Sequence, residues 1–125
     1  MDVTPRLEAG RQRIQSYGGG GFKIGGQRFD GSVFVLPDQV LQWYGPSYKD
    51  LTQSDFELIR DFAESIDILL LGCGAEVGPP RDDLAALLRQ DKIVLEPMET
   101  GAACRTFNVL LHEDRRVAAA LIAIE

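Results

Sequence analysis

The fold class is decided by residues 67–74, Asp67-Ile-Leu-Leu-Leu-Gly-Cys-Gly74. Residues 68–71 are all apolar and show no polar alternation. A strand that is apolar on both faces must be covered on both faces, as central strands of α/β sheets are. The run ends at two glycines around Cys73, and ligands of open α/β sheets tend to bind just beyond such carboxyl ends. We therefore expect the middle strand of an α/β sheet, with a candidate site at its end.

The composition fits one globular domain. The chain has 125 residues, of which 45% are hydrophobic and 26% are charged. Its formal net charge is -6, whereas binding to nucleic acid or to anionic membranes needs clustered Lys and Arg. No apolar run is long enough to span a bilayer, and residues 1–5 lack the pattern of a signal peptide. We expect a cytoplasmic protein that neither binds nucleic acid nor inserts into a membrane.

Two cysteines and one histidine limit the metal and redox chemistry. Cys73, Cys104 and His112 show no zinc-ligand spacing, and together they cannot complete a zinc set. A cytoplasm also keeps thiols reduced. We expect two small, partly buried cysteine side chains, with no bound metal and no cofactor.

The first thirty residues predict a tail followed by hairpins. Residues 1–12 are polar and contain proline and glycine, so we expect a flexible tail before a single domain over residues 13–125. Short alternating runs between residues 14 and 29 are separated by glycines, a pattern typical of twisted β-hairpins. The four glycines at 18–21 do not fit a phosphate-binding loop, because the spacing is wrong and no helix follows. They predict a tight bend.

The middle of the chain predicts alternating strands and helices. A first helix should begin at Thr52, a good N-cap with Asp55 three residues later. A second helix should follow Pro79-Pro80, because proline suits the first helical position. A buried strand over residues 93–95 should stop before Pro97. This alternation predicts mostly parallel strands joined by right-handed crossovers. The apolar stripe of the first helix comprises Phe56, Ile59, Phe62, Ala63 and Ile66.

Residues 100–124 fit two structures. Residues 107–121 can be read as a hairpin. Alternatively, Thr100 caps a helix with an apolar stripe at i, i+4, i+7 and i+8, and residues 117–122 form a final strand of small residues.

Ordered motifs give the chain a family resemblance from about Ile14 onward. It resembles the Mth-type domain family, which includes mitochondrial respiratory complex I assembly factor 3, the adipogenesis-associated Mth-domain protein and small bacterial proteins. Cys73 departs from that pattern, which expects Thr or a similar small residue. The motifs are Tyr17-Gly18, Gly20-Gly21-Phe22, Gly31-Ser32-Val33, Trp43, Gly72-Cys73-Gly74, Met98–Asn108 and Glu113–Leu121.

The resemblance implies a three-layer α/β domain with a central mixed sheet and a helix at the start of the last segment. It implies no cofactor and no established enzymatic activity. It also implies a protein-binding role, with complex I subunits or assembly factors as partners. From it we expect a non-enzymatic binding domain similar to an assembly factor of respiratory complex I.

A candidate pocket follows if the strands at residues 68 and 93 are adjacent and parallel. Their carboxyl ends would then meet the start of the last helix. The backbone amides of Gly101 and Ala102, with the Thr100 hydroxyl and Arg105, would suit an anion or a partner's carboxylate. Ordinary helix capping and tight turns explain the same residues. The candidate pocket comprises Gly72, Cys73, Gly74, Thr100, Gly101, Arg105 and Asn108.

The alternative to a protein-binding domain is a small-molecule or anion-binding protein, or an enzyme, that uses this pocket. A nucleophilic Cys73 would need a neighbouring base to lower its pKa. His112 should lie at the far end of the last helix, which disfavours a Cys–His enzyme.

Overall fold

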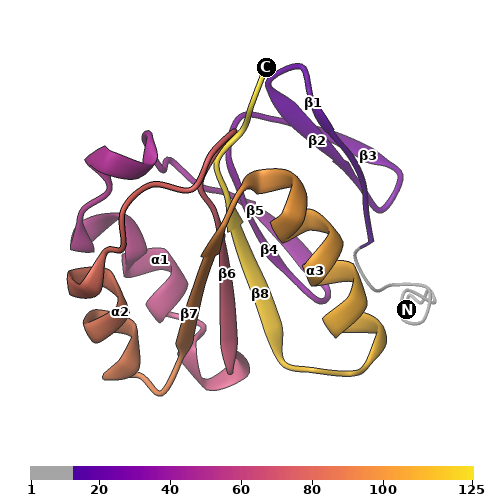
Figure 1. The fold of residues 1–125 in the computed structure, drawn as a ribbon. Coiled ribbons are helices and arrows are strands. Elements are labelled where there is room, and N and C mark those ends of the chain that lie inside the picture. Colours follow the sequence, from indigo (N-terminus) through magenta and orange to yellow (C-terminus); the bar gives the residue numbers. More distant parts are fainter. Residues whose placement is uncertain (1–12) are drawn as a thin grey trace.

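A computed structural model describes residues 13–125, and the predicted tail over residues 1–12 lies outside the described residues. Figure 1 shows helices on both sides of a central sheet. The strands are β1 (Ile14–Gly18), β2 (Gly21–Ile24), β3 (Gln27–Asp30), β4 (Val33–Leu36), β5 (Gln39–Gln42), β6 (Ile68–Gly72), β7 (Val94–Met98) and β8 (Val117–Leu121). The helices are α1 (Glu57–Arg60), α2 (Asp82–Arg89) and α3 (Thr100–His112), with 3₁₀ turns η2 (Tyr48–Asp50), η3 (Gln53–Phe56) and η4 (Ala63–Ser65).

The central sheet is mixed, with the strand order β5-β4-β8-β6-β7. Strand β6 runs parallel to β7 and β8, whereas β4 runs antiparallel to β5 and β8. The expectation of a mixed α/β fold is confirmed. A mostly parallel sheet was wrong, because the β4–β5 hairpin joins β8 in the antiparallel sense. The middle strand is β8 and not β6, and the fully buried alanines at 118–120 suit a strand covered on both faces.

The glycine-rich region forms the predicted hairpins. Strands β1, β2 and β3 make an antiparallel sheet of their own. The turn between β1 and β2 holds Gly18, Gly19 and Gly20 at positive φ, where other residues are strained. The backbone N–H of Gly20 donates to the carbonyl of Ile124 at 2.8 Å, which ties this turn to the end of the chain.

Alternating side chains of the central sheet enter two different cores. Leu69 and Leu71 of β6 pack with residues of α1 and α2, whereas Leu70 packs with α3 and the three-stranded sheet. Figure 1 shows α1 and α2 on one side of the sheet and α3 on the other. The apolar run of residues 68–71 therefore has the predicted cause, which is burial on both faces.

The first predicted helix is broken into short turns. Its apolar stripe is confirmed as part of the core, but the chain over residues 53–65 forms η3, α1 and η4. The indole N–H of Trp43 donates to the carbonyl of Asp55 at 2.8 Å, and the Trp43 ring packs on Phe56 with centroids 5.9 Å apart. These tertiary contacts use a carbonyl that a regular helix would need for itself.

The second helix begins later than predicted, at Asp82. Pro79 belongs to the preceding loop, where its carbonyl accepts a hydrogen bond from the Tyr48 hydroxyl at 2.7 Å. The guanidinium of Arg81 donates to the carbonyls of Tyr48 and Leu51. This loop is therefore fastened to η2 before the helix starts.

Strand β7 is longer and more exposed than predicted. It contains Pro97, and Val94 is 55% exposed. Strand β7 lies at the edge of the sheet, and position 97 faces away from β6. The missing N–H of Pro97 therefore removes no hydrogen bond between β6 and β7. Of the two structures expected for residues 100–124, the hairpin is not formed. The chain forms a helix, α3, followed by the strand β8.

An ion pair joins α1 to the turn after α2. Arg60 Nε lies 2.5 Å from Asp91 Oδ2, and Arg60 Nη2 lies 3.4 Å from Asp91 Oδ1. The hydrogen bond from Arg60 holds the pKa of Asp91 below its ordinary value. A depressed folded-state pKa stabilises the fold above the unfolded pKa, which is about 3.9 for Asp.

Replacing Asp91 should therefore change the acid dependence of stability. We expect Asp91→Asn to lower the melting temperature at pH 7, and the difference from the parent protein to shrink as the pH falls through the folded pKa. Melting curves between pH 7 and pH 2 measure this. Asp61→Asn is the matched control, because Asp61 is exposed and forms no ion pair within residues 13–125. A constant difference across the range would contradict the assignment.

Candidate functional site

The carboxyl ends of β6 and β8 meet the start of α3 at a buried threonine. The Thr100 hydroxyl donates to the carbonyl of Ile122 at 2.7 Å and accepts from the backbone N–H of Gly74 at 2.9 Å. The backbone N–H of Thr100 donates to the carbonyl of Gly74 at 2.9 Å. Thr100 is 0% exposed. We call the hydrogen-bonded group of Gly72–Gly74, Thr100 and Ile122 the strand-end junction.

The prediction that Thr100 caps its own helix is wrong. The N-cap of α3 is Glu99, and Thr100 is the first helical residue. Its hydroxyl bonds to partners just beyond β6 and just beyond β8, at sequence separations of 26 and 22 residues. The side chain therefore joins strands instead of closing a helix end.

The glycine–cysteine–glycine stretch lies inside the same junction. The N–H of Cys73 donates to the carbonyl of Met98 at 2.8 Å, and the carbonyl of Gly72 accepts from Ile122 at 3.0 Å. A Cβ on Gly72 would lie 3.1 Å from the Thr100 Cα and hydroxyl. Gly72 is needed because the backbone of α3 approaches β6 closely.

The start of α3 is covered by the three-stranded sheet. Gly101 is buried, and a Cβ there would collide with the hydroxyl and ring of Tyr17 from β1. The expected anion-binding face at Gly101 therefore lies against an aromatic side chain.

Arg105 and Asn108 lie farther along α3. Arg105 is exposed, whereas the Asn108 side chain binds the backbone of Ile14 in β1. The Asn108 amide accepts from the N–H of Ile14 and donates to its carbonyl, both at 2.9 Å. The structure thus brings together the predicted residues Gly72, Cys73, Gly74, Thr100 and Gly101, and places Arg105 and Asn108 elsewhere on the helix.

The thiols are placed in surroundings that favour the protonated form. Cys73 is 6% exposed, and its Sγ lies 3.5 Å from the carbonyl of Leu71. Burial raises the pKa of the Cys73 thiol, and it raises the pKa of Cys104 to about 12. His112 is the last residue of α3, so it lies at the other end of the helix from the junction. These thiols lack the activation that nucleophilic cysteines need.

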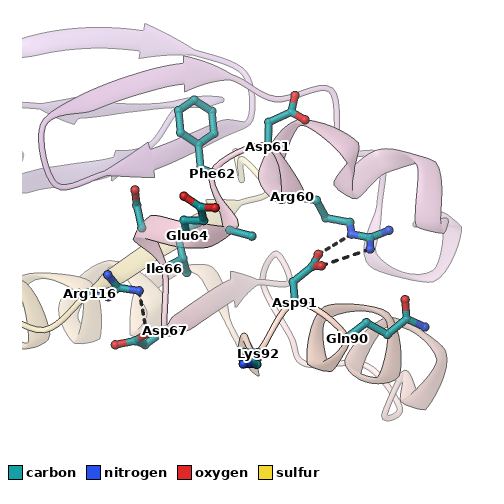
Figure 2. A pocket seen from close by; sticks show the side chains of 12 residues that line it. Arg60, Asp61, Phe62, Glu64, Ile66, Asp67, Gln90, Asp91, Lys92 and Arg116 are labelled. Atoms are coloured by element: carbon teal, nitrogen blue, oxygen red, sulfur yellow. Dashed lines mark hydrogen bonds and ion pairs between the residues drawn. The ribbon is translucent and has the colours of Figure 1, made fainter.

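An open hollow of about 680 Å³ lies at the opposite end of the sheet. It is lined by residues 60–67, residues 90–92 and Arg116, which directly precede or lie near the amino ends of the parallel strands. Figure 2 shows Arg60 directed at Asp91 and Arg116 directed at Asp67. The Arg116–Asp67 pair is 3.2 Å long and exposed. We call this group of residues the amino-end hollow.

The chemistry of the amino-end hollow is that of paired charges. The lowered pKa of Asp91 keeps its carboxylate ionised at neutral pH, so it is not a proton donor. Arg60, Asp61 and Glu64 lie outside the predicted apolar stripe of the first helix, and the sequence pattern does not indicate that they line a hollow. No local signal identifies the hollow, because its walls come from segments that are far apart in the chain.

Nowhere in residues 13–125 do three His, Cys, Asp or Glu side chains gather closely enough to bind a metal ion. No helix in the described part of the chain is long and apolar enough to cross a membrane.

Comparison with known proteins places the chain in a family. Residues 14–122 match the family described as "Protein of unknown function (DUF498/DUF598)". The chain belongs to this family. The predicted Mth-type resemblance is confirmed by this match and by the 38% identity to an assembly factor 3 protein. A Mth938-like domain from Bordetella pertussis has the same fold, with a TM-score of 0.79 at 24% identity over 98% of this chain and 90% of that one.

Similar proteins include an assembly factor and a bacterial protein of known structure. The human protein named NADH dehydrogenase (ubiquinone) 1 alpha subcomplex assembly factor 3 is 38% identical over 122 residues, or 98% of this chain. The chain spans 66% of the human protein and 59% of its bovine counterpart. A crystal structure described as an outer membrane protein from Bartonella henselae is 39% identical, with a TM-score of 0.81 over 92% of this chain and 97% of that one.

In this DUF498/DUF598 protein, the Thr100 hydroxyl can be removed at nearly constant volume. Thr100→Val leaves the Gly74 N–H and the Ile122 carbonyl buried without a partner. Each unsatisfied buried group costs about 1–3 kcal/mol, so we expect a loss of roughly 2–4 kcal/mol in the free energy of unfolding. Thr100→Ser keeps the hydroxyl and should cost only about 1 kcal/mol. Urea unfolding compares the two, and equal stabilities would show that the hydroxyl is not needed.

Cys73 should be unreactive in the folded family member. Burial and the raised pKa both disfavour the thiolate, so iodoacetamide at pH 7.5 (about one unit below a free thiol's pKa) should label Cys73 at least tenfold more slowly in native protein than in urea. Mass spectrometry of peptides containing Cys73 or Cys104 measures each rate. Rapid labelling of Cys73 in the native protein would instead indicate an activated thiol.

Proposed function

We propose that this protein is a non-enzymatic protein-binding domain that acts like an assembly factor for respiratory complex I. The observation that carries the proposal is the 38% identity to human assembly factor 3 across 98% of this chain. Because the human protein is longer, the part that the two share is this domain. We infer that the shared domain contacts protein partners, which would be complex I subunits or other assembly factors.

The geometry of the strand ends supports binding over catalysis. The amide and hydroxyl groups of the strand-end junction already bind one another, and Tyr17 covers Gly101. An anion or small molecule at this place would have to replace buried hydrogen bonds, which costs free energy. We therefore do not favour the alternative of a small-molecule site or an enzyme at Gly72–Gly74 and Thr100–Arg105.

The proposal also covers the layers of the fold and the compartment in which the protein acts. We propose a three-layer arrangement in which α1 and α2 form one outer layer and α3 with the three-stranded sheet forms the other. We also propose that the protein acts in the cytoplasm, where peripheral parts of complex I would be within reach. The net charge of -6 is compatible with protein partners and disfavours nucleic acid.

Deletion of the gene in the organism that encodes it tests the role. We expect the amount of fully assembled complex I on native gels to fall severalfold and smaller subassemblies to accumulate, because an assembly factor speeds maturation. The NADH oxidation rate of membranes should fall in parallel. Restoring the gene should restore both, and the ATP synthase band is the internal control. Normal complex I in the deletion strain would contradict the proposal.

A further inference from the structure

The two outer strands of the central sheet differ in how their free edges are protected. In β7 the N–H of Val94 donates to Asp67, and the carbonyl of Met98 accepts from Cys73. By alternation, the backbone groups of Leu95 and Pro97 face the free edge. Pro97 has no N–H to offer an added strand. A proline on an edge strand is a known protection against further pairing.

The free edge of β5 has no such protection. The N–H of Trp43 donates to the carbonyl of Ser32 at 3.1 Å, and Gln39 pairs with Leu36 in the β4–β5 register. By the same alternation, the backbone N–H and C=O groups of Val40 and Gln42 face away from β4. No strand within residues 13–125 pairs with this edge. Residues 39–45 contain neither proline nor a charged residue.

A small hollow lies beside one end of this edge. Its volume is about 260 Å³, and its walls include Trp43, Tyr44 and Leu58 together with the acidic residues Asp55 and Glu57. Tyr44 is 80% exposed, although it is aromatic. Trp43 is fixed by its hydrogen bond to Asp55. The hollow therefore joins an aliphatic and aromatic wall to two acidic residues. The Asp55 carboxylate already accepts a hydrogen bond from the backbone N–H of Thr52 at 2.8 Å, whereas Glu57 is exposed.

We propose that the free edge of β5 binds an extended segment of a partner protein as an additional strand, with a Lys or Arg side chain of that segment in the hollow beside Tyr44. Backbone groups at Val40 and Gln42 would supply the pairing. The exposed Glu57 carboxylate, with the negative charge of Asp55 beside it, attracts a cation, and the Tyr44 ring favours one over its face. This proposal rests on the proposed protein-binding function and names the chemistry of the partner.

A second copy of the same chain fits this edge less well. Two β5 edges related by a two-fold axis would pair antiparallel. Residues 38–45 contain no Lys or Arg that could enter the hollow of the other copy. Asp38 at the far end of β5 would instead approach the carboxylates of Asp55 and Glu57, which is unfavourable. A basic segment of a different protein satisfies both the edge and the hollow.

Binding of short peptides to the full chain tests the proposal directly. The probe is a fluorescein-labelled heptapeptide of alternating Thr and Val with a central Lys, and the matched peptide carries a central Glu. We expect the Lys peptide to bind at least tenfold more tightly by fluorescence anisotropy. Gln42→Pro removes one outward N–H without removing a bond to β4 and should weaken binding more than tenfold. Val94→Lys on the β7 edge is the control and should leave binding unchanged.

A second variant separates docking from folding. Glu57 is exposed, so Glu57→Lys should leave the melting temperature unchanged. It should weaken binding of the Lys peptide more than tenfold and strengthen binding of the Glu peptide. Amide hydrogen exchange should show new protection at Val40 and Gln42 when the Lys peptide is bound. Equal binding of the two peptides, no binding of either, or protection only at another edge would overturn the proposal. A concentration-dependent dimer that Gln42→Pro abolishes would assign the edge to a second copy and overturn it too.

The outcomes also separate this inference from the assembly role. Normal complex I in the deletion strain, together with edge-specific peptide binding, would reject the assembly role and keep the docking edge. If a gene encoding the Gln42→Pro variant fully restores complex I in that strain, the docking edge is rejected and the assembly role is kept.

Discussion

The fold depends on one buried hydroxyl that acts as donor and acceptor at once. The Thr100 hydroxyl accepts a hydrogen bond from the N–H of Gly74 and donates one to the carbonyl of Ile122. It therefore joins the end of β6 to the end of β8. Its own backbone N–H returns to the carbonyl of Gly74. The parallel pair β6–β8 and the helix that crosses between β7 and β8 therefore meet at a single side chain. Valine has the same shape but neither function, and serine lacks the packing methyl group.

Much of the fold could be predicted from local patterns. The apolar run at residues 68–71 identified a strand buried on both faces, and the glycines at 18–21 identified a turn between hairpin strands. The errors arose where a distant contact overrode a local preference. Trp43 takes the carbonyl of Asp55 and interrupts the first helix. The alanine-rich β8 occupies the centre of the sheet, which apolar content alone would have assigned to β6.

The candidate site shows the same limit more sharply. The sequence correctly brought Gly72–Gly74 together with Thr100, because parallel strands carry their carboxyl ends to one edge. It could not show that the groups there bind one another, since Ile122 and Tyr17 come from other parts of the chain. Asn108 illustrates the same point, because it is a predicted pocket residue and its amide in fact binds the backbone of Ile14 in β1. The amino-end hollow is likewise assembled from three separate segments, residues 60–67, residues 90–92 and Arg116, so no spacing rule would find it.

The unequal edges of the central sheet suit a protein that binds partners for a limited time. At the β7 edge, Pro97 has no N–H to donate, which hinders pairing with a strand of another molecule. An open edge at β5 is only a few residues long, so an added strand would gain few hydrogen bonds. Each backbone bond contributes about 0.5–1.5 kcal/mol net, which favours a complex that can dissociate. The proposed assembly role requires a complex that can dissociate, and the proposed docking edge, which is short and has an acidic hollow beside it, meets that requirement better than a large apolar interface would.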